Sequence, residues 1–142
     1  MGKNVHDDVL DAALNVLKTN ANRLVVLTSE PTGASAYTNA MTAVDSSGYQ
    51  LAAATISASD FTGPADGSTS GRKITVNAQS SMSIDGIAAS SASAQHVALV
   101  QYHASSASSQ AVLYTTTCTA QTLTAGNKVN TPAWVVEIRD PS

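Results

Sequence analysis

The last third of the chain carries most of its bulky apolar residues, in short runs that predict β-strands. Within residues 95–103 (QHVALVQYH), Val97 and Leu99 fall on one face of an extended chain, whereas Ala98 and Val100 fall on the other. A strand that is apolar on both faces is typical of the interior of a sheet that is covered above and below. We therefore expect this strand to lie at the centre of the fold.

The runs that follow continue the strand pattern to the end of the chain. Residues 111–118 (AVLYTTTC) are rich in β-branched and aromatic side chains, which fit a pleated surface. The small polar residues 104–110 between these two runs predict a hairpin connection. Gly126 and Asn127 predict a turn because both tolerate positive φ, and residues 133–138 predict the last strand.

The beginning of the chain has the period of an amphipathic helix, which is expected within residues 4–20. Asn4 is expected to cap it, with the acidic residues Asp7 and Asp8 in the first turn and Lys18 near the end, all favourable to the helix dipole. The apolar residues fill an arc of about 200°, wider than packing on one sheet requires. Either the helix is sunk into its own domain, or one side of it meets a neighbouring subunit or the surface of another protein. The candidate contact residues are Val9, Leu10, Ala13, Leu14 and Leu17.

Shorter strand-like runs and polar connections fill the middle of the chain. Strands are expected at residues 23–29, 73–78 and 80–85, with residues 50–57 either a weak strand or a loop and residues 87–94 a small-residue link. Residues 30–50 and 58–72 contain Gly and Pro and predict long loops.

Together these elements predict a mainly β fold in a single domain spanning residues 1–142. One N-terminal α-helix would precede an antiparallel β-sandwich or barrel of about seven to eight strands in residues 23–138.

The composition is unusual in its small side chains and its low charge. Ala, Ser and Thr supply about two-fifths of the chain, and aromatic residues only 4%. A core built from such residues is thin, so we expect association with other chains to add stability. Charged residues make up 12%, about half the usual share, and the net charge is −3. This balance argues against nucleic acid as a partner, because binding phosphates requires clustered Lys and Arg.

Other features of the sequence bear on location and redox chemistry. Cys118 is the only cysteine, and within a β-rich run it is expected to be a buried small apolar side chain. No run approaches the ~20 apolar residues of a membrane span, and the polar residues 1–8 are followed by no apolar signal-peptide region. We expect synthesis in a cytoplasm and no membrane partner.

Two acidic clusters could suggest metal binding, but their spacing argues against it. His6, Asp7 and Asp8 are adjacent in the expected helix, so their side chains point in different directions. Asp60 and Asp66 lie in a loop that lacks the alternating ligands and terminal Glu of an EF-hand. A solvated surface is expected at both places.

The signatures of catalysis do not occur in the sequence. His96 and His103 are seven residues apart, so they face opposite sides of one strand. No serine stands in a G-x-S-x-G elbow, and the stretch 63–71 does not continue as the Gly-Lys-Ser/Thr of a P-loop. We therefore expect no catalytic, cofactor-binding or metal-binding residues, and a protein that is not an enzyme.

Three parts of the chain stand out together: residues 4–32 (NVHDDVLDAALNVLKTNANRLVVLTSEPT), residues 60–78 (DFTGPADGSTSGRKITVNA), and residues 95–100 with 113–138 (QHVALV and LYTTTCTAQTLTAGNKVNTPAWVVEI). In this order they resemble a family of small virion proteins encoded beside the major capsid gene of tailed bacteriophages. The resemblance implies a capsid decoration (cement) protein on the surface of the virion, with the major capsid protein as its partner. A neck, head-spike or minor tail component is the alternative within the same class.

Two further expectations concern the oligomeric state and glycan binding. The expected association would be a homo-oligomer, with a trimer as the first guess. A module that binds host glycans is an alternative from another class, and it would need exposed aromatic platforms, for which Tyr37, Tyr49 and Phe61 are the candidates.

Overall fold

A computed structural model describes residues 4–141 of the protein, which form a mainly β fold. Two α-helices and nine strands follow one another along the chain: α1 (Asp7–Asn20), β1 (Arg23–Leu27), α2 (Ala36–Met41), β2 (Gln50–Thr55), β3 (Phe61–Asp66), β4 (Arg72–Val76), β5 (Gln79–Ser83), β6 (Ser91–Gln101), β7 (Ala111–Thr124), β8 (Lys128–Thr131) and β9 (Trp134–Ile138).

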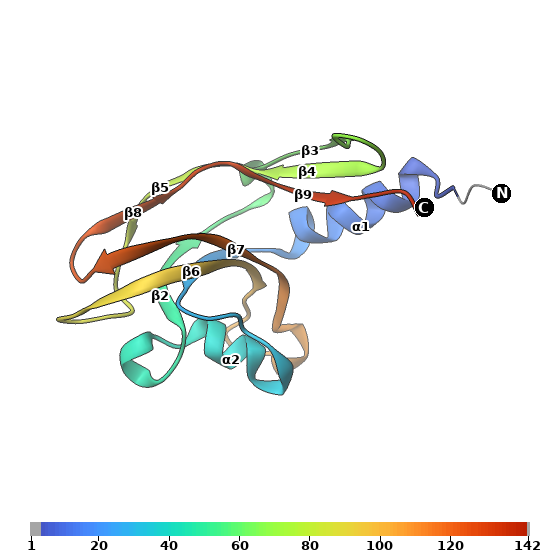
Figure 1. Ribbon diagram of the computed structural model, residues 1–142. Coiled ribbons are helices and arrows are strands. Elements are labelled where there is room, and N and C mark those ends of the chain that lie inside the picture. The colour runs from blue at the N-terminus through green and yellow to red at the C-terminus, as the bar shows by residue number, and fades with distance from the viewer. Residues whose placement is uncertain (1–3, 142) are drawn as a thin grey trace.

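The strands form two facing layers, and every strand pair is antiparallel. One layer is a four-stranded sheet in the order β2-β1-β6-β7. The other consists of the sheet β3-β4-β9 and the pair β5-β8, which continues the line of β4 and β9 (Figure 1). The predicted antiparallel sandwich with an N-terminal helix is confirmed, with nine strands in place of seven or eight.

The central strand β6 is buried on both faces, as its apolar pattern predicts. Val97 and Leu99 join the core between the two layers. Ala98 and Val100 belong to a second core on the opposite face of the sheet. Its neighbour β1 alternates in the same way between the two cores. This arrangement requires a cover on the outer face of the four-stranded sheet.

Helix α2 provides that cover, within a segment predicted to be a loop. Ala40 of α2 is fully buried in the second core, and Tyr37 and Met41 pack against it (Figure 1). The loop prediction for residues 30–50 is wrong at this place. Only six residues form the helix, too few for a clear helical period, and burial against the sheet stabilises them.

Helix α1 begins later than expected, and a different residue caps it. It starts at Asp7, and Nδ1 of the N-cap residue His6 accepts a hydrogen bond from the backbone N–H of Asp8 at 3.2 Å. The prediction that Asn4 is the cap is therefore wrong. Asp7 and Asp8 lie in the first turn and Lys18 in the last, as expected from the helix dipole.

Two other loop predictions are corrected by strand pairing. Within residues 58–72, β3 pairs with β4 although it contains Pro64, because Pro64 lies where the register shifts and β3 is the edge of its sheet. Within residues 87–94, β6 begins at Ser91, which pairs with Thr124 of β7. In both cases the strand forms because its backbone pairs with a neighbouring strand. Its small polar side chains give no sequence pattern that predicts this pairing.

The burial of α1 leads to a stability prediction. Leu14 is 1% exposed and Val16, on the same helix, is 47% exposed. Leu14→Ala is expected to lower the free energy of unfolding by about 2–5 kcal/mol because it leaves a cavity in the core. Val16→Ala is the matched control, expected to change it by no more than about 0.5 kcal/mol. Urea unfolding followed by circular dichroism measures both, and similar losses in the two variants would contradict this burial.

Candidate functional site

Helix α1 has two apolar faces, and the domain uses only one of them. Leu10, Leu14 and Leu17 are 6%, 1% and 8% exposed. Val9 is 60% exposed, and Ala13 is also exposed. The structure therefore divides the five predicted contact residues. The three leucines are unavailable to a partner because the protein's own core buries them, and contact through Val9 and Ala13 stays a prediction.

Val9 and Ala13 belong to a longer apolar surface along the helix. Ala12 and Val16 are also exposed, and the four residues are spaced three or four apart, so they share one face. We call Val9, Ala12, Ala13 and Val16 the α1 outer stripe. The width of the apolar arc was the sequence signal for this stripe. The sequence could not separate it from the buried face because the arc is continuous.

Charged side chains fix α1 on the sheet β3-β4-β9. Nε and Nη2 of Arg72, on β4, donate to the two carboxylate oxygens of Asp11 at 2.6 and 3.0 Å. Arg72 also donates to Asp66 at the end of β3, and Nζ of Lys18 donates to the carbonyl of Gly63 at 3.1 Å. The hydrogen bonds that Arg72 donates to the Asp11 carboxylate are the first cause of the raised pKa of Arg72. These contacts hold the helix in one orientation, with the outer stripe turned away from the sheet.

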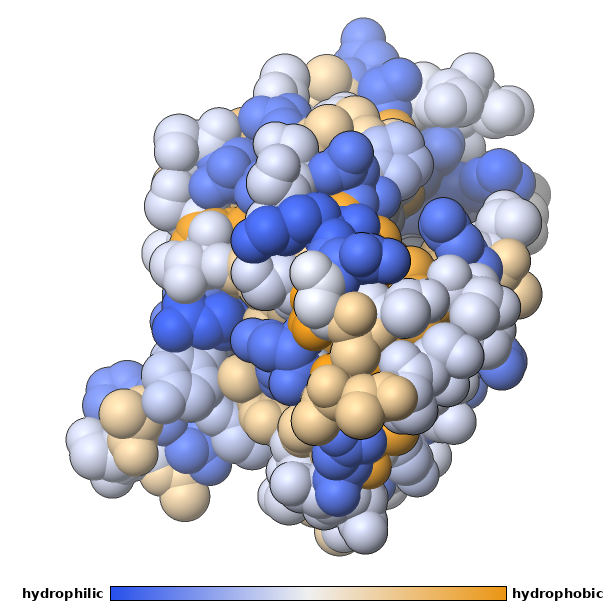
Figure 2. Space-filling view, turned by 90° about the vertical axis from the view of Figure 1, so that its left-hand side faces the viewer, coloured by the Kyte–Doolittle hydropathy of each residue, from blue (hydrophilic) through white to orange (hydrophobic). Residues whose placement is uncertain are grey.

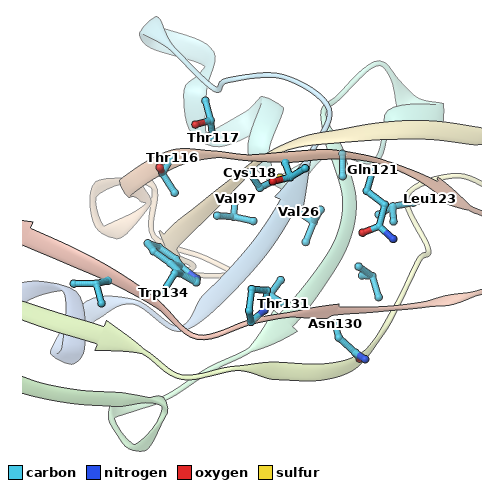
Figure 3. Close-up of a pocket in the computed structure, with 15 residues that line it drawn as sticks. Val26, Val97, Thr116, Thr117, Cys118, Gln121, Leu123, Asn130, Thr131 and Trp134 are labelled. Atoms are coloured by element: carbon cyan, nitrogen blue, oxygen red, sulfur yellow. The ribbon is translucent and has the colours of Figure 1, made fainter.

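A second feature is a cavity of about 470 Å³ between β7 and the segment β8–β9. Figure 3 shows Val26, Val97 and Trp134 in the space between these strands, whereas Thr117 and Asn130 point away from it. None of the residues that line the cavity carries a formal charge. The cavity is therefore an apolar site with a few neutral polar groups, and sequence reasoning did not detect it.

An irregularity in β7 accompanies the cavity. Ala94 pairs with Gln121 and His96 with Thr117, so the single residue Gln95 of β6 lies opposite three residues of β7, 118–120. Such a bulge bends the strand that carries the extra residues. Cys118 and Thr119, which line the cavity, belong to this bulge. Because β7 is the edge of its sheet, no further strand within residues 4–141 pairs with it on that side.

Two polar atoms among the cavity-lining residues are buried without a hydrogen-bond partner in the part of the chain that the structure describes. They are Oγ1 of Thr131 and Nε1 of Trp134. Thr131 is only 7% exposed, and the Trp134 ring stacks on Tyr114 with centroids 5.8 Å apart. Leaving a buried polar group unpaired costs about 1–3 kcal/mol, so this pair is the most distinctive chemical feature of the cavity.

Cys118 lies in the wall of the cavity and is half-buried. It packs against the core between the layers, close to its expected role as a small apolar side chain. Desolvation by burial raises the pKa of its thiol. The reactive thiolate form is therefore scarcer at neutral pH than in a free cysteine.

The residues weighed for metal binding lie in separate environments. His6 caps α1, and Asp66 binds Arg72. The carboxylate of Asp60 accepts hydrogen bonds from the side chain of Gln79 at 3.1 Å and the backbone N–H of Ser57 at 2.8 Å, which lower the pKa of Asp60. Across residues 4–141, no three His, Cys, Asp or Glu side chains group as they would around a metal ion.

The two histidines of β6 and its following loop do not form a joint site. His96 is half-buried within the strand, where it pairs with Leu27 and Thr117. His103 is exposed beyond the strand end, and its Nδ1 accepts a hydrogen bond from the backbone N–H of Ser106 at 3.1 Å.

Neither of the helices in the described part of the chain has the length and apolar character needed to span a membrane.

The structure is an antiparallel β-sandwich with helices packed on it, an exposed apolar stripe on α1 and an uncharged cavity between β7 and β8–β9. No family model, curated protein or solved structure matches the chain.

The environment of Cys118 predicts slow thiol chemistry. Because burial raises its pKa, modification by 5,5′-dithiobis(2-nitrobenzoate) at pH 7.5 is expected to be slower than that of N-acetylcysteine, with a rate profile displaced to higher pH. A variant with Cys118→Ala and Thr119→Cys moves the thiol to an exposed neighbour and should react faster. Equal rates for the two proteins would show that the Cys118 thiol is not desolvated.

Proposed function

We propose that the protein is a non-enzymatic structural component of a tailed-bacteriophage virion, and that it acts as a decoration protein on the outside of the head. It would be made in the host cytoplasm and bind a shell built by the major capsid protein. The resemblance of three chain segments to small virion proteins supports this proposal, and so does a surface suited to adhesion. The α1 outer stripe is the structural observation that carries it.

The outer stripe concentrates exposed apolar side chains at one place. Val9, Val16 and Val135 are the large apolar residues that remain exposed among those described, and two of the three lie on this stripe. The opposite end of the molecule is different: Figure 2 shows mainly hydrophilic and intermediate residues there, with hydrophobic residues in small patches. The concentration of exposed apolar side chains on one helix indicates where a partner would bind.

The size of the stripe suits a weak contact that is repeated many times. Fully burying a valine contributes about 1.5–3 kcal/mol, so burying the exposed parts of Val9 and Val16 adds about 1 kcal/mol each. Together these amount to a factor of about 30 in affinity, too little for tight binding alone. A lattice of identical sites multiplies such contacts when copies are joined, which fits the proposed trimer or another symmetric oligomer.

The alternatives make different demands on the molecule. A neck, head-spike or minor tail component would use the same stripe in far fewer copies. A glycan-binding module requires exposed aromatic rings, but Phe61 is 4% exposed, and Tyr37 and Tyr49 pack against the second core. This packing favours a structural role over glycan recognition.

Copy number in the particle tests the proposal directly. We expect quantitative gels of purified virions to give on the order of hundreds of copies, and cryo-electron microscopy to place them on the shell lattice. About six or twelve copies at a single vertex would instead indicate the neck or tail. Absence of the protein from purified particles would refute a virion role.

The role of the outer stripe is tested with a matched pair of charge substitutions. Val16→Asp is expected to weaken binding to heads that lack the protein by about tenfold or more, because a charge would then be desolvated at the contact. Asn15→Asp adds the same charge at a neighbouring exposed position off the stripe and should bind as the native protein does. Circular dichroism confirms that both variants are folded, and equal binding by the two would exclude the stripe as the contact.

A further inference from the structure

We infer that the cavity between β7 and β8–β9 is a binding site for a neutral, largely apolar small molecule that carries one hydrogen-bond acceptor, such as a carbonyl oxygen. This inference rests on the geometry of the cavity and is independent of the proposed role in the virion.

The size and lining of the cavity set the apolar character of the ligand. A volume of about 470 Å³ lies within the range of about 300–1,000 Å³ that is usual for ligand sites. Val26 and Val97 form its inner part between the two sheets, and Leu123 and Val129 add apolar surface. A ligand that fills this space removes its own apolar surface and that of the protein from water.

The lining also excludes charged ligands. Every residue around the cavity is uncharged, so a bound carboxylate or ammonium group would be desolvated without a counter-charge. The neutral polar side chains come from Thr, Gln, Asn, Trp and Cys. The site therefore selects an uncharged molecule.

The two unpaired buried atoms set the polar group of the ligand. Nε1 of Trp134 can only donate a hydrogen bond, and the hydroxyl of Thr131 can donate or accept. The two residues lie at the end of β8 and the start of β9, and in Figure 3 the indole nitrogen is on the side of the ring toward Thr131. An acceptor oxygen of a ligand that reaches either atom would supply the hydrogen-bond partner that this atom lacks. A carbonyl oxygen, with two lone pairs, meets this requirement.

The residue types in the cavity provide two reporters of occupancy. Trp134 is the only tryptophan of the chain, so the indole N–H gives a single signal in a ¹H–¹⁵N spectrum. Cys118 is the only cysteine and lies in the wall, so its rate of modification reports access to the same space.

The experiment titrates the protein with two probes of matched shape, cyclohexanone and methylenecyclohexane, which differ in the carbonyl acceptor. Cyclohexanone is expected to shift the Trp134 indole N–H downfield, to slow the modification of Cys118, and to bind about five- to tenfold more tightly than methylenecyclohexane. If neither cyclohexanone at tens of millimolar nor methylenecyclohexane at saturation changes either signal, the cavity is not a ligand site. If both bind equally, the acceptor part of the inference is wrong.

Two variants test separately the hydrogen bond to the ligand and the volume of the cavity. Thr131→Val keeps the shape of the side chain and removes its hydroxyl, so the preference for cyclohexanone should fall while methylenecyclohexane still binds. Ala94→Leu narrows the cavity from β6 and should abolish binding of both probes. Circular dichroism checks that each variant is folded. If Ala94→Leu does not fold, Thr116→Leu is a second variant that narrows the cavity. Unchanged probe binding in folded narrowed variants would place the probes elsewhere and overturn the inference.

Discussion

The rest of the structure depends on burying both faces of the central strands β1 and β6. Their alternate side chains enter two different cores, so the four-stranded sheet must be covered on each side. The second β layer and α1 complete one core, and α2 with Tyr49 completes the other. Without either cover, a row of Val, Leu and Ala would face water, and the sheet would lose the apolar burial that stabilises it.

The chain meets this demand with few large residues, and this shortage explains the cavity. The leucines of α1 are used in the core, and the helix is also held by the hydrogen bonds between Arg72 and Asp11. Val9 and Val16, on the other side of the helix, stay exposed. At the open side of the sandwich, small side chains such as Ala94 and Thr116 do not fill the space between the layers, and a cavity remains.

The two surfaces suit different kinds of binding. The outer stripe consists of apolar side chains alone, so a contact there would gain apolar burial but little chemical selectivity. The cavity is concave and contains two buried polar atoms without partners, so it can select a ligand by hydrogen bonding. The proposed role in a particle would use the first surface, and the proposed ligand would occupy the second.

The sequence alone determined the features that follow from local pattern. The two-sided β6 strand, the helix at the beginning of the chain, the antiparallel sandwich and the excess apolar width of α1 all follow from the period of the side chains. Tertiary structure decided the rest. Helix α2 forms because the second core buries Ala40, and β3 forms around Pro64 because β4 offers a ladder. The cavity arises where the bulge of β7 faces β8 and β9, with Val26 of β1 and Val97 of β6 in its wall, so it needs strands from distant parts of the chain. Such features depend on contacts between distant segments, which no local period encodes.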